Sequence, residues 1–263
     1  MVLQSDDGND ALQVVAFAEG LADLAAPIAL KYFRQKLAVE AKADASPVTV
    51  ADREIEAAIR RRIRESFPEH GLFGEEHGFE GLDSERIWVI DPIDGTKSFI
   101  SGMPTFGTLI ACLEKGVVIA GVVDHPALRE RWVGYRGGRT LHNGQPCQTS
   151  GRTHLAEAIL YTTTPDLFNS KDRSAFDAVS KKVSLRRFGG DCYAYALLAS
   201  GHIDLVLEAG LQPYDYLSLV PVIEGAGGVI TDWQGQKLDL NSDGRVVAAA
   251  TPELHREVLS CLE

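Results

Sequence analysis

The sequence predicts a mixed α/β protein, in which an α+β first half precedes a layered α/β second half. Apolar residues recur at helical spacing near the N-terminus, strand-like runs follow one another between residues 86 and 150, and strand-like and helix-like segments alternate after about residue 155. Such alternation is typical of layered α/β folds. No repeat or flexible linker separates residues 1–150 from residues 151–263, so the two halves are predicted to pack as one structural unit.

Two helices are expected before the first strands. Residues 10–35 carry apolar side chains at helical spacing, and the segment after Pro47 repeats isoleucine every four residues with arginines on the opposite face. Pro68 and Gly71 should end this second helix. Asp52 lies in its first turn, where the helix dipole favours a carboxylate, so local pattern alone gives Asp52 a structural role.

The next segments have the pattern of strands. Runs rich in β-branched and aromatic residues begin near 86, 105, 116 and 129, with tight-turn signals between them, so an antiparallel meander is expected from about 86 to 150. The expected strands of the second half cover residues 158–164, 183–188, 203–210, 228–233 and 246–250, and its expected helices cover 172–182, 191–200, 214–226 and 252–262.

Composition limits the classes of function. The chain has 263 residues, of which 45% are hydrophobic and 24% charged, and its net charge is −11. Binding to nucleic acid or to an anionic membrane usually needs a basic surface, so neither partner is expected. No signal peptide is expected, and no uninterrupted apolar segment approaches the ~20 residues of a membrane span. Four irregularly spaced cysteines are expected to be reduced, in a cytoplasmic protein.

The segment WVIDPIDGTKSF, residues 88–99, places two carboxylates at the end of an apolar strand. Asp91 ends the apolar run, and Asp94 follows Pro92 and Ile93, which should turn the chain back and free the Ile93 carbonyl. Hard divalent cations take carboxylate and carbonyl oxygens as ligands. Asp91 could therefore bridge two ions while Asp94 binds one of them.

Neighbouring residues extend this candidate site. Gly95 and Thr96 should open a short helix whose N–H groups face a phosphate. Glu75 follows a short strand with a glycine turn, and Asp215 opens an apolar helix. An isolated pair of aspartates is most often a turn or a helix cap, but the ordered set of acidic residues strengthens the prediction. The histidines show no zinc-binding spacing.

Three stretches together resemble the inositol monophosphatase family of magnesium-dependent, lithium-sensitive phosphatases: GEE at 74–76, WVIDPIDGT at 88–96, and YD at 214–215 followed by the apolar helix. The resemblance runs from about residue 10 to the C-terminus, and D-P-I-D-G-T after an apolar strand is highly specific for the family. It implies a layered αβαβα sandwich, usually a homodimer. It also implies hydrolysis of a small-molecule phosphate ester by a metal-activated water that attacks phosphorus in line.

The resemblance assigns roles to individual residues. The implied ligands are Glu75, Asp91 and the Ile93 carbonyl for a first Mg²⁺, and Asp91, Asp94 and Asp215 for a second, with Glu75 helping to hold a third, weaker ion. Asp52 and Thr96 would orient and deprotonate the attacking water, and they form the implied catalytic set with Glu75. The N–H groups of Gly95 and Thr96 would bind phosphate.

Within the family, residues 101–111 and 186–228 resemble the enzymes that hydrolyse histidinol phosphate in histidine biosynthesis. Inositol enzymes usually carry tryptophan before the late aspartate, where this chain has Tyr214, and a small residue at the position of Asp191. The resemblance puts Asp191 and Glu208 around the leaving group, whose ammonium and imidazole would suit carboxylates. Local pattern leaves open that Asp191 is a helix N-cap and that Glu208 caps a strand edge.

Two alternatives for function stay open. The substrate could be inositol 1-phosphate or another sugar or nucleotide phosphate. In a different class, some relatives act as protein-binding factors of the transcription machinery. A purely noncatalytic role is disfavoured, because clustered carboxylates without a cation would cost stability.

Overall fold

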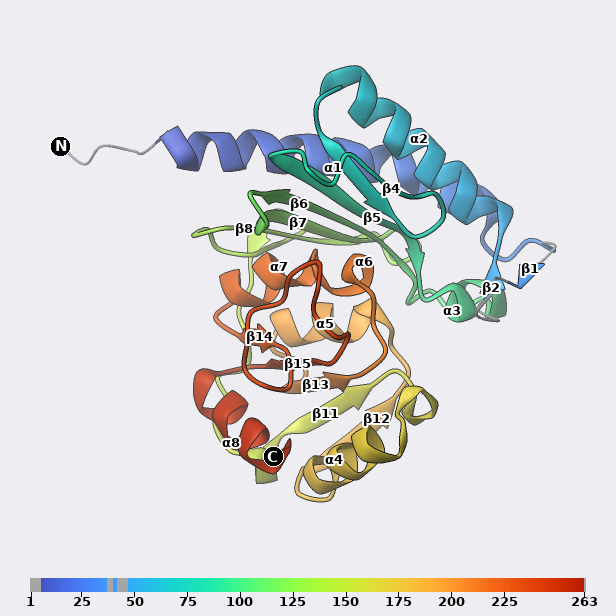
Figure 1. The fold of residues 1–263 in the computed structure, drawn as a ribbon. Coiled ribbons are helices and arrows are strands. Elements are labelled where there is room, and N and C mark those ends of the chain that lie inside the picture. The colour runs from blue at the N-terminus through green and yellow to red at the C-terminus, as the bar shows by residue number, and fades with distance from the viewer. Residues whose placement is uncertain (1–5, 37–39, 42–46, 263) are drawn as a thin grey trace.

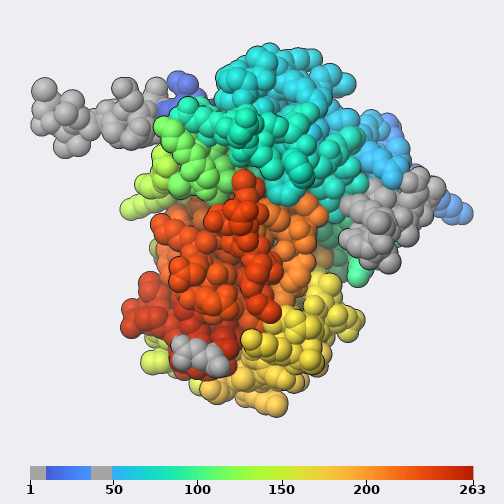
Figure 2. Space-filling model, in the orientation of Figure 1, coloured from blue at the N-terminus to red at the C-terminus, as the bar shows by residue number. Residues whose placement is uncertain are grey.

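The protein is described by a computed structural model that covers residues 6–36, 40–41 and 47–262 (Figure 1). Its secondary structure forms five layers: helices α1 and α2, an eight-stranded sheet, helices α5–α7, a five-stranded sheet, and helices α4 and α8. Figure 2 shows the same layers in direct contact, with the cyan and green first half above the orange and red second half. The predicted αβαβα sandwich is confirmed.

The helices are α1 (Asp6–Tyr32), α2 (Val50–Ser66), α3 (Thr96–Ser101), α4 (Ser170–Ser180), α5 (Cys192–Ala199), α6 (Pro213–Tyr216), α7 (Leu219–Gly225) and α8 (Pro252–Leu262), with 3-10 turns η1 (Leu155–Glu157) and η2 (Pro165–Leu167). The strands of the first half are β1 (Glu40–Ala41), β2 (Pro47–Val48), β3 (Gly71–Gly74), β4 (Gly78–Glu80), β5 (Arg86–Asp94), β6 (Gly107–Glu114), β7 (Val117–His125), β8 (Glu130–Tyr135), β9 (Leu141–His142) and β10 (Gln145–Pro146). Those of the second half are β11 (Ile159–Thr162), β12 (Leu185–Phe188), β13 (Leu205–Glu208), β14 (Val229–Thr231) and β15 (Val246–Ala249).

The large sheet has the strand order β10-β9-β8-β7-β6-β5-β3-β4. Its antiparallel meander from β5 to β10 agrees with the expectation from sequence. The sequence did not indicate that β3 pairs with β5 in parallel, in register from Gly71 opposite Ile87 to Gly74 opposite Ile90. Because the two strands run in the same direction, their carboxyl ends lie at the same end of the sheet, where the candidate site is found.

The small sheet has the order β12-β11-β13-β15-β14, with β11 parallel to both of its neighbours and β15 antiparallel to β13 and β14. Three hydrophobic clusters fill the spaces between the layers. Successive side chains of β5 point to opposite faces of the large sheet and so enter two of these clusters. Trp88 and Ile90 face α1 and α2, and Ile87 and Val89 face α5–α7.

Helix α1 is the longest apolar helix of the described residues. By length and composition alone, Asp10–Tyr32 could cross a membrane, although Glu19 and Asp23 interrupt its apolar residues. The test is weak, because the core helix of a globular protein also passes it. Here Ala18, Leu21, Ala25 and Ala29 are buried in the cluster between α1, α2 and the large sheet, and that packing accounts for the apolar face.

The expected helix over 214–226 is instead two helices. Pro221 lies in α7 and has no N–H to donate to the carbonyl four residues earlier, at Leu217, so the chain breaks between α6 and α7. This break presses the Ser218 carbonyl against β7, where a side chain at Gly121 would come within 2.1 Å of that oxygen. The short helix α6 thereby holds Asp215 over the edge of the large sheet.

Candidate metal and phosphate site

A bulge at the end of β5 brings Asp91 and Asp94 to the same side of the strand. Asp91 pairs with Leu109 and Asp94 with Gly107, so three steps along β5 match two along β6. Residues three apart in a regular strand point to opposite faces, and the extra residue of a bulge reverses that relation. The sequence predicted that the chain turns back at Pro92 and Ile93. That prediction was wrong, because the chain continues as a strand to Asp94.

Local hydrogen bonds fix the bulge. The Thr108 hydroxyl donates to the Pro92 carbonyl at 2.9 Å, and the Ile93 N–H donates to the Asp91 carboxylate at 3.0 Å. Proline fits at a bulge because the residue there does not have to donate a backbone N–H to the neighbouring strand. The Ile93 carbonyl accepts a bond from the Thr96 hydroxyl at 3.3 Å, while the Ile93 side chain is fully buried.

Two further acidic residues complete the site. The parallel pairing of β3 with β5 places Glu75 directly after β3, where its N–H donates to the Ile90 carbonyl at 3.2 Å, one residue before Asp91. Asp215 is the third residue of α6, and its carboxylate accepts the Gln212 N–H at 2.7 Å. The sequence-predicted acidic residues thus converge from three elements.

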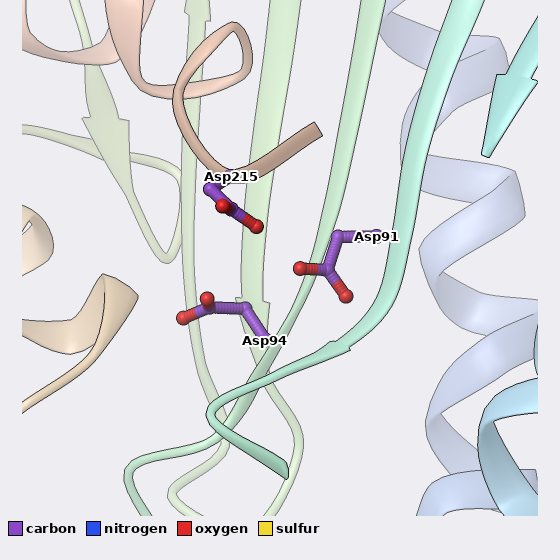
Figure 3. A group of neighbouring side chains, drawn as sticks. All are labelled: Asp91, Asp94 and Asp215. Atoms are coloured by element: carbon purple, nitrogen blue, oxygen red, sulfur yellow. The ribbon is translucent and has the colours of Figure 1, made fainter. Parts of the chain in front are cut away.

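Asp91 and Asp215 point toward one another from β5 and α6, and Asp94 lies beside them with its carboxylate turned away from Asp91 (Figure 3). One oxygen from each of Asp91, Asp94 and Asp215 lies within 4.8 Å of the others. Burial, followed by repulsion from Glu75, raises the pKa of Asp91 well above its usual value, and burial with repulsion from Asp94 does the same for Asp215. Burial and the charge of Asp191 raise the pKa of Asp94 to about 7.

This set of donors fits a divalent cation. Several carboxylates held this close repel one another, and a cation among them removes that cost. All the donors are oxygens, the ligand type that Mg²⁺, Mn²⁺ and Ca²⁺ prefer over zinc. Glu75, Asp91, Asp94, Asp215 and the Ile93 carbonyl are the residues that would hold it.

The start of α3 lies beside these carboxylates. Gly95, the residue before the helix, has φ 79° and ψ 42°, a left-handed conformation that glycine adopts at little cost. A side chain at Gly95 would also come within 2.8 Å of the Asp191 carboxyl carbon. The glycine of the D-G-T segment therefore lets the candidate phosphate loop approach Asp191.

Asp52 is fully buried at the third position of α2. One of its oxygens accepts both the N–H and the hydroxyl of Thr49, at 2.9 and 2.6 Å, and Thr49 and Asp52 form a capping box, so Asp52 also has a structural role at the start of α2. Its other oxygen is buried and lacks a hydrogen-bond partner among the described residues. Burial is the main cause of its raised pKa, and Glu75 adds to the shift. Within the described part of the chain, no hydrogen bond joins Asp52 to Thr96.

A pocket of about 140 Å³ adjoins the aspartates, because Asp94 and Asp215 line it together with Asp191 and Glu208. Asp191 precedes α5, but its carboxylate makes no capping bond and instead accepts from the Ser98 hydroxyl at 2.5 Å. Asp94 provides the cap, since its carboxylate accepts the Cys192 N–H at 2.6 Å. The N-cap alternative for the Asp191 side chain is therefore wrong.

Glu208 ends β13 in the interior of the small sheet and is 1% exposed, so it does not cap a sheet edge. One of its oxygens accepts the Thr163 N–H and hydroxyl at 2.7 and 2.8 Å, and the other accepts the Thr162 hydroxyl at 3.2 Å. Burial raises the pKa of Glu208 to about 7, although these hydrogen bonds act to lower it. A carboxyl group is thus held at the wall of the pocket nearest the small sheet.

A larger groove, of about 470 Å³, lies between α1 and strands β7 and β8. Its buried carboxylate, Asp124, and the nearby Asp23 both pair with Arg131, at 2.7 and 2.8 Å. Both carboxylates therefore already have a cationic partner in Arg131.

Sequence reasoning missed the residues that support the site. Glu56 is fully buried on α2, and its two oxygens accept the N–H groups of Glu76 and His77 at 2.7 and 3.2 Å. Ser98 and Thr163 hold the carboxylates of the pocket. Only Thr49 had a signal in the sequence, because a threonine three residues before an acidic residue can form a capping box.

Comparison with known proteins gives a consistent result. The model of the "Inositol monophosphatase family" matches residues 10–263. The "Bifunctional phosphatase IMPL2, chloroplastic" of Arabidopsis thaliana is 48% identical over 94% of this chain and 74% of its own, and a "Histidinol-phosphatase" of Chlorobaculum parvum is 37% identical over 87% and 89%. A solved inositol monophosphatase from Zymomonas mobilis superposes with a TM-score of 0.88, at 44% identity over 98% of this chain and 99% of that one. The chain therefore belongs to the inositol monophosphatase family.

Proposed function

We propose that this phosphatase hydrolyses histidinol phosphate with Mg²⁺ as its cofactor. The observation that carries the proposal is the pair of carboxyl groups, Asp191 and Glu208, in the pocket beside the three-aspartate cluster. Carboxylates near a phosphate site add repulsion unless the leaving group brings positive charge or N–H donors. The ammonium and imidazole of histidinol supply both, whereas a polyol supplies only hydroxyl groups.

The family is metal-dependent, and the described donors fit two Mg²⁺ ions, with Glu75 helping to hold a third. When bound, such ions neutralise the phosphate, lower the pKa of the attacking water and stabilise the leaving oxygen. Asp91 is close enough to feel the charges of Glu75, Asp94 and Asp215, which supports the bridging role that the family resemblance gives it. The identity and number of the ions come from the family resemblance and belong to the proposal.

The chain's own groups would act on the water and on the substrate. The unpaired oxygen of Asp52 and the Thr96 hydroxyl would orient the water, and the raised pKa of Asp52 makes this carboxylate a better proton acceptor than an ordinary aspartate. The N–H groups of Gly95 and Thr96 would bind phosphate oxygens. Asp191 would accept from the ammonium and Glu208 from the ring N–H.

A phosphate-release assay on the purified chain tests the proposal. The panel would hold histidinol phosphate, inositol 1-phosphate, adenosine bisphosphate and glycerol phosphate, each with Mg²⁺ and with EDTA. We expect the highest kcat/KM for histidinol phosphate and loss of turnover in EDTA. Equal or higher kcat/KM for inositol 1-phosphate would refute the substrate assignment, and full turnover in EDTA would refute metal dependence.

Inositol 1-phosphate is the second candidate substrate, because the Zymomonas mobilis structure that is 44% identical is described as an inositol monophosphatase. The assay separates the two candidates directly. We also propose a homodimer, as the family resemblance implies, and light scattering of the purified chain would test it.

A further inference from the structure

One residue that lines the leaving-group pocket carries a buried hydroxyl group with no hydrogen-bond partner in the described part of the chain. Tyr195 lines the pocket from α5 and is 3% exposed. Its hydroxyl oxygen is buried and has no hydrogen-bond partner among the described residues. A buried hydroxyl without a partner costs free energy, so its presence beside an open pocket indicates a group that arrives with the ligand.

Tyr195 and Glu208 line this pocket together. The charge of Glu208 is the largest electrostatic influence on Tyr195 after burial, ahead of Asp94 and Asp215. Burial raises the pKa of the phenol well above its usual value, so the hydroxyl keeps its proton and can donate it in a hydrogen bond. The pocket therefore offers a free donor next to a carboxyl group.

Glu208 has one acceptor position left. A carboxylate can accept about four hydrogen bonds, and Glu208 accepts three, two on one oxygen from Thr163 and one on the other from Thr162. The remaining position is on the oxygen that Thr162 contacts. One free donor and one free acceptor, both on well-buried side chains, match a ligand group that presents one acceptor and one donor in a rigid frame.

We propose that Tyr195 and Glu208 together recognise a neutral imidazole ring on the leaving group. The Tyr195 hydroxyl donates to the bare ring nitrogen, and Glu208 accepts from the ring N–H. This inference rests on the proposed function and names the residue pair that selects the ring, leaving Asp191 for the ammonium. The apolar side chains of Leu167 and Leu211 line the same pocket and suit the faces of a flat ring.

The ring and the protein can be changed independently. L-Phenylalaninol phosphate keeps the ammonium and an aromatic ring but has no ring nitrogen. Tyr195→Phe removes only the hydroxyl. We expect the wild-type protein to favour histidinol phosphate over phenylalaninol phosphate in kcat/KM, and Tyr195→Phe to reduce this preference by about 10–100-fold, or about 1.4–2.8 kcal/mol. The reduction should come almost entirely from histidinol phosphate, chiefly as a raised KM.

Tyr193→Phe is the matched control. Tyr193 lies on the same helix, but its hydroxyl donates to Glu130 at 2.8 Å and is not part of the pocket lining. This variant should keep the wild-type preference between the two substrates. Tyr195→Phe should also melt at the same temperature as the wild type or higher, because it loses a hydroxyl that has no partner within the protein.

The outcomes separate the two levels of inference. If the wild type favours histidinol phosphate but Tyr195→Phe keeps that preference, or loses both substrates equally, ring recognition by Tyr195 is overturned and the proposed function stands. If the wild type does not hydrolyse histidinol phosphate, the proposed function and the ring assignment both fail. A marked drop in melting temperature of Tyr195→Phe would show that the hydroxyl has a structural partner, which also overturns the proposal.

Discussion

Ser98 donates a hydrogen bond to Asp191 at 2.5 Å, although 93 residues separate them in the chain. Ser98 lies in α3, directly after the candidate phosphate loop, and Asp191 precedes α5 and lines the pocket. The approach is possible because Gly95 lacks a side chain, which would lie 2.8 Å from the Asp191 carboxyl carbon. The candidate phosphate loop and the pocket lined by Asp191 are therefore joined by a hydrogen bond.

Asp191→Asn should lower kcat/KM for histidinol phosphate by about 10–150-fold, because a charge-assisted hydrogen bond is worth about 1.5–3 kcal/mol. Glycerol phosphate has no cation for Asp191 to bind, so its kcat/KM should change far less. Ser98→Ala is the matched control, since it removes the bond but keeps the charge, and its effect on histidinol phosphate should be smaller. Equal losses for both substrates in Asp191→Asn would mean that Asp191 is structural.

Asp91→Asn should abolish turnover and Mg²⁺ binding, measured by phosphate release and by titration calorimetry, because Asp91 is the candidate bridging ligand. The metal-free variant should melt at a higher temperature than the metal-free wild type, since one charge leaves a cluster of repelling carboxylates. Asp124→Asn is a control that disrupts a buried pair with Arg131 away from the site. It should lower the melting temperature yet keep Mg²⁺-dependent turnover; turnover by Asp91→Asn would refute the bridging role.

Several parts of the fold and site follow from local sequence, and others depend on contacts that local sequence does not encode. The meander from β5 to β10 was predictable because alternating apolar residues and tight turns specify antiparallel neighbours. The parallel pairing of β3 with β5 was not, because β4 lies between these strands in the chain and no tight turn joins them to set the register. Asp91 and Asp94 were predictable as a pair, but the bulge that puts them on one side is a property of the pairing with β6.

Supporting residues were hidden for the same reason. Glu56 and Arg60 look in the sequence like an ordinary surface ion pair one helical turn apart, yet both are buried, 0% and 4% exposed. Tyr195 looks like a core aromatic, and only the structure shows that its hydroxyl is unpaired beside a pocket. The free energy of these groups depends on what the fold places around them.

Glu56→Gln should weaken Mg²⁺ binding by about 10–100-fold, the usual effect of changing a residue that orients a ligand. Glu56 accepts the N–H groups of Glu76 and His77 and so fixes the turn that carries Glu75. In the Gln variant, the side-chain NH₂ would face one of these N–H groups, so two donors would meet and that hydrogen bond would be lost. Glu54→Gln is the matched control, because Glu54 lies on α2 like Glu56 but is partly exposed and pairs with Lys31 of α1. This variant should bind Mg²⁺ normally. Unchanged affinity in Glu56→Gln, measured by calorimetry, would rule out this positioning role.

Thr96→Ala should reduce kcat by roughly 10²–10⁴-fold with little change in KM, because a group used mainly in the transition state affects turnover more than binding. Ser101→Ala, which removes a hydroxyl at the other end of α3 that donates to the Ser98 carbonyl, should keep the wild-type kcat. A raised KM with a normal kcat in Thr96→Ala would assign Thr96 to substrate binding instead.

Metal-free protein should lose stability as the pH rises from about 6.5 to 8.5. Asp94 and Glu208 have a pKa of about 7 in the folded protein, above their usual values of 3.8 and 4.5, so the folded state binds more protons than the unfolded state in this range. The free energy of unfolding then falls with pH. Between about pH 4 and 6.5 the buried His125, whose pKa is lowered to about 4, acts in the opposite sense and offsets part of the fall, so the range above 6.5 is free of this effect.

Mg²⁺ should reverse this trend, because it binds the ionised carboxylates and stabilises the folded state by mass action. The increase in melting temperature that Mg²⁺ causes should therefore be larger at pH 8 than at pH 6.5. Glu208→Gln should reduce the fall in EDTA without removing it, since the three aspartates still titrate. Thermal unfolding in EDTA and in excess Mg²⁺ measures all three effects, and a melting temperature in EDTA that stays constant or rises over this range would contradict the raised pKa values of the cluster.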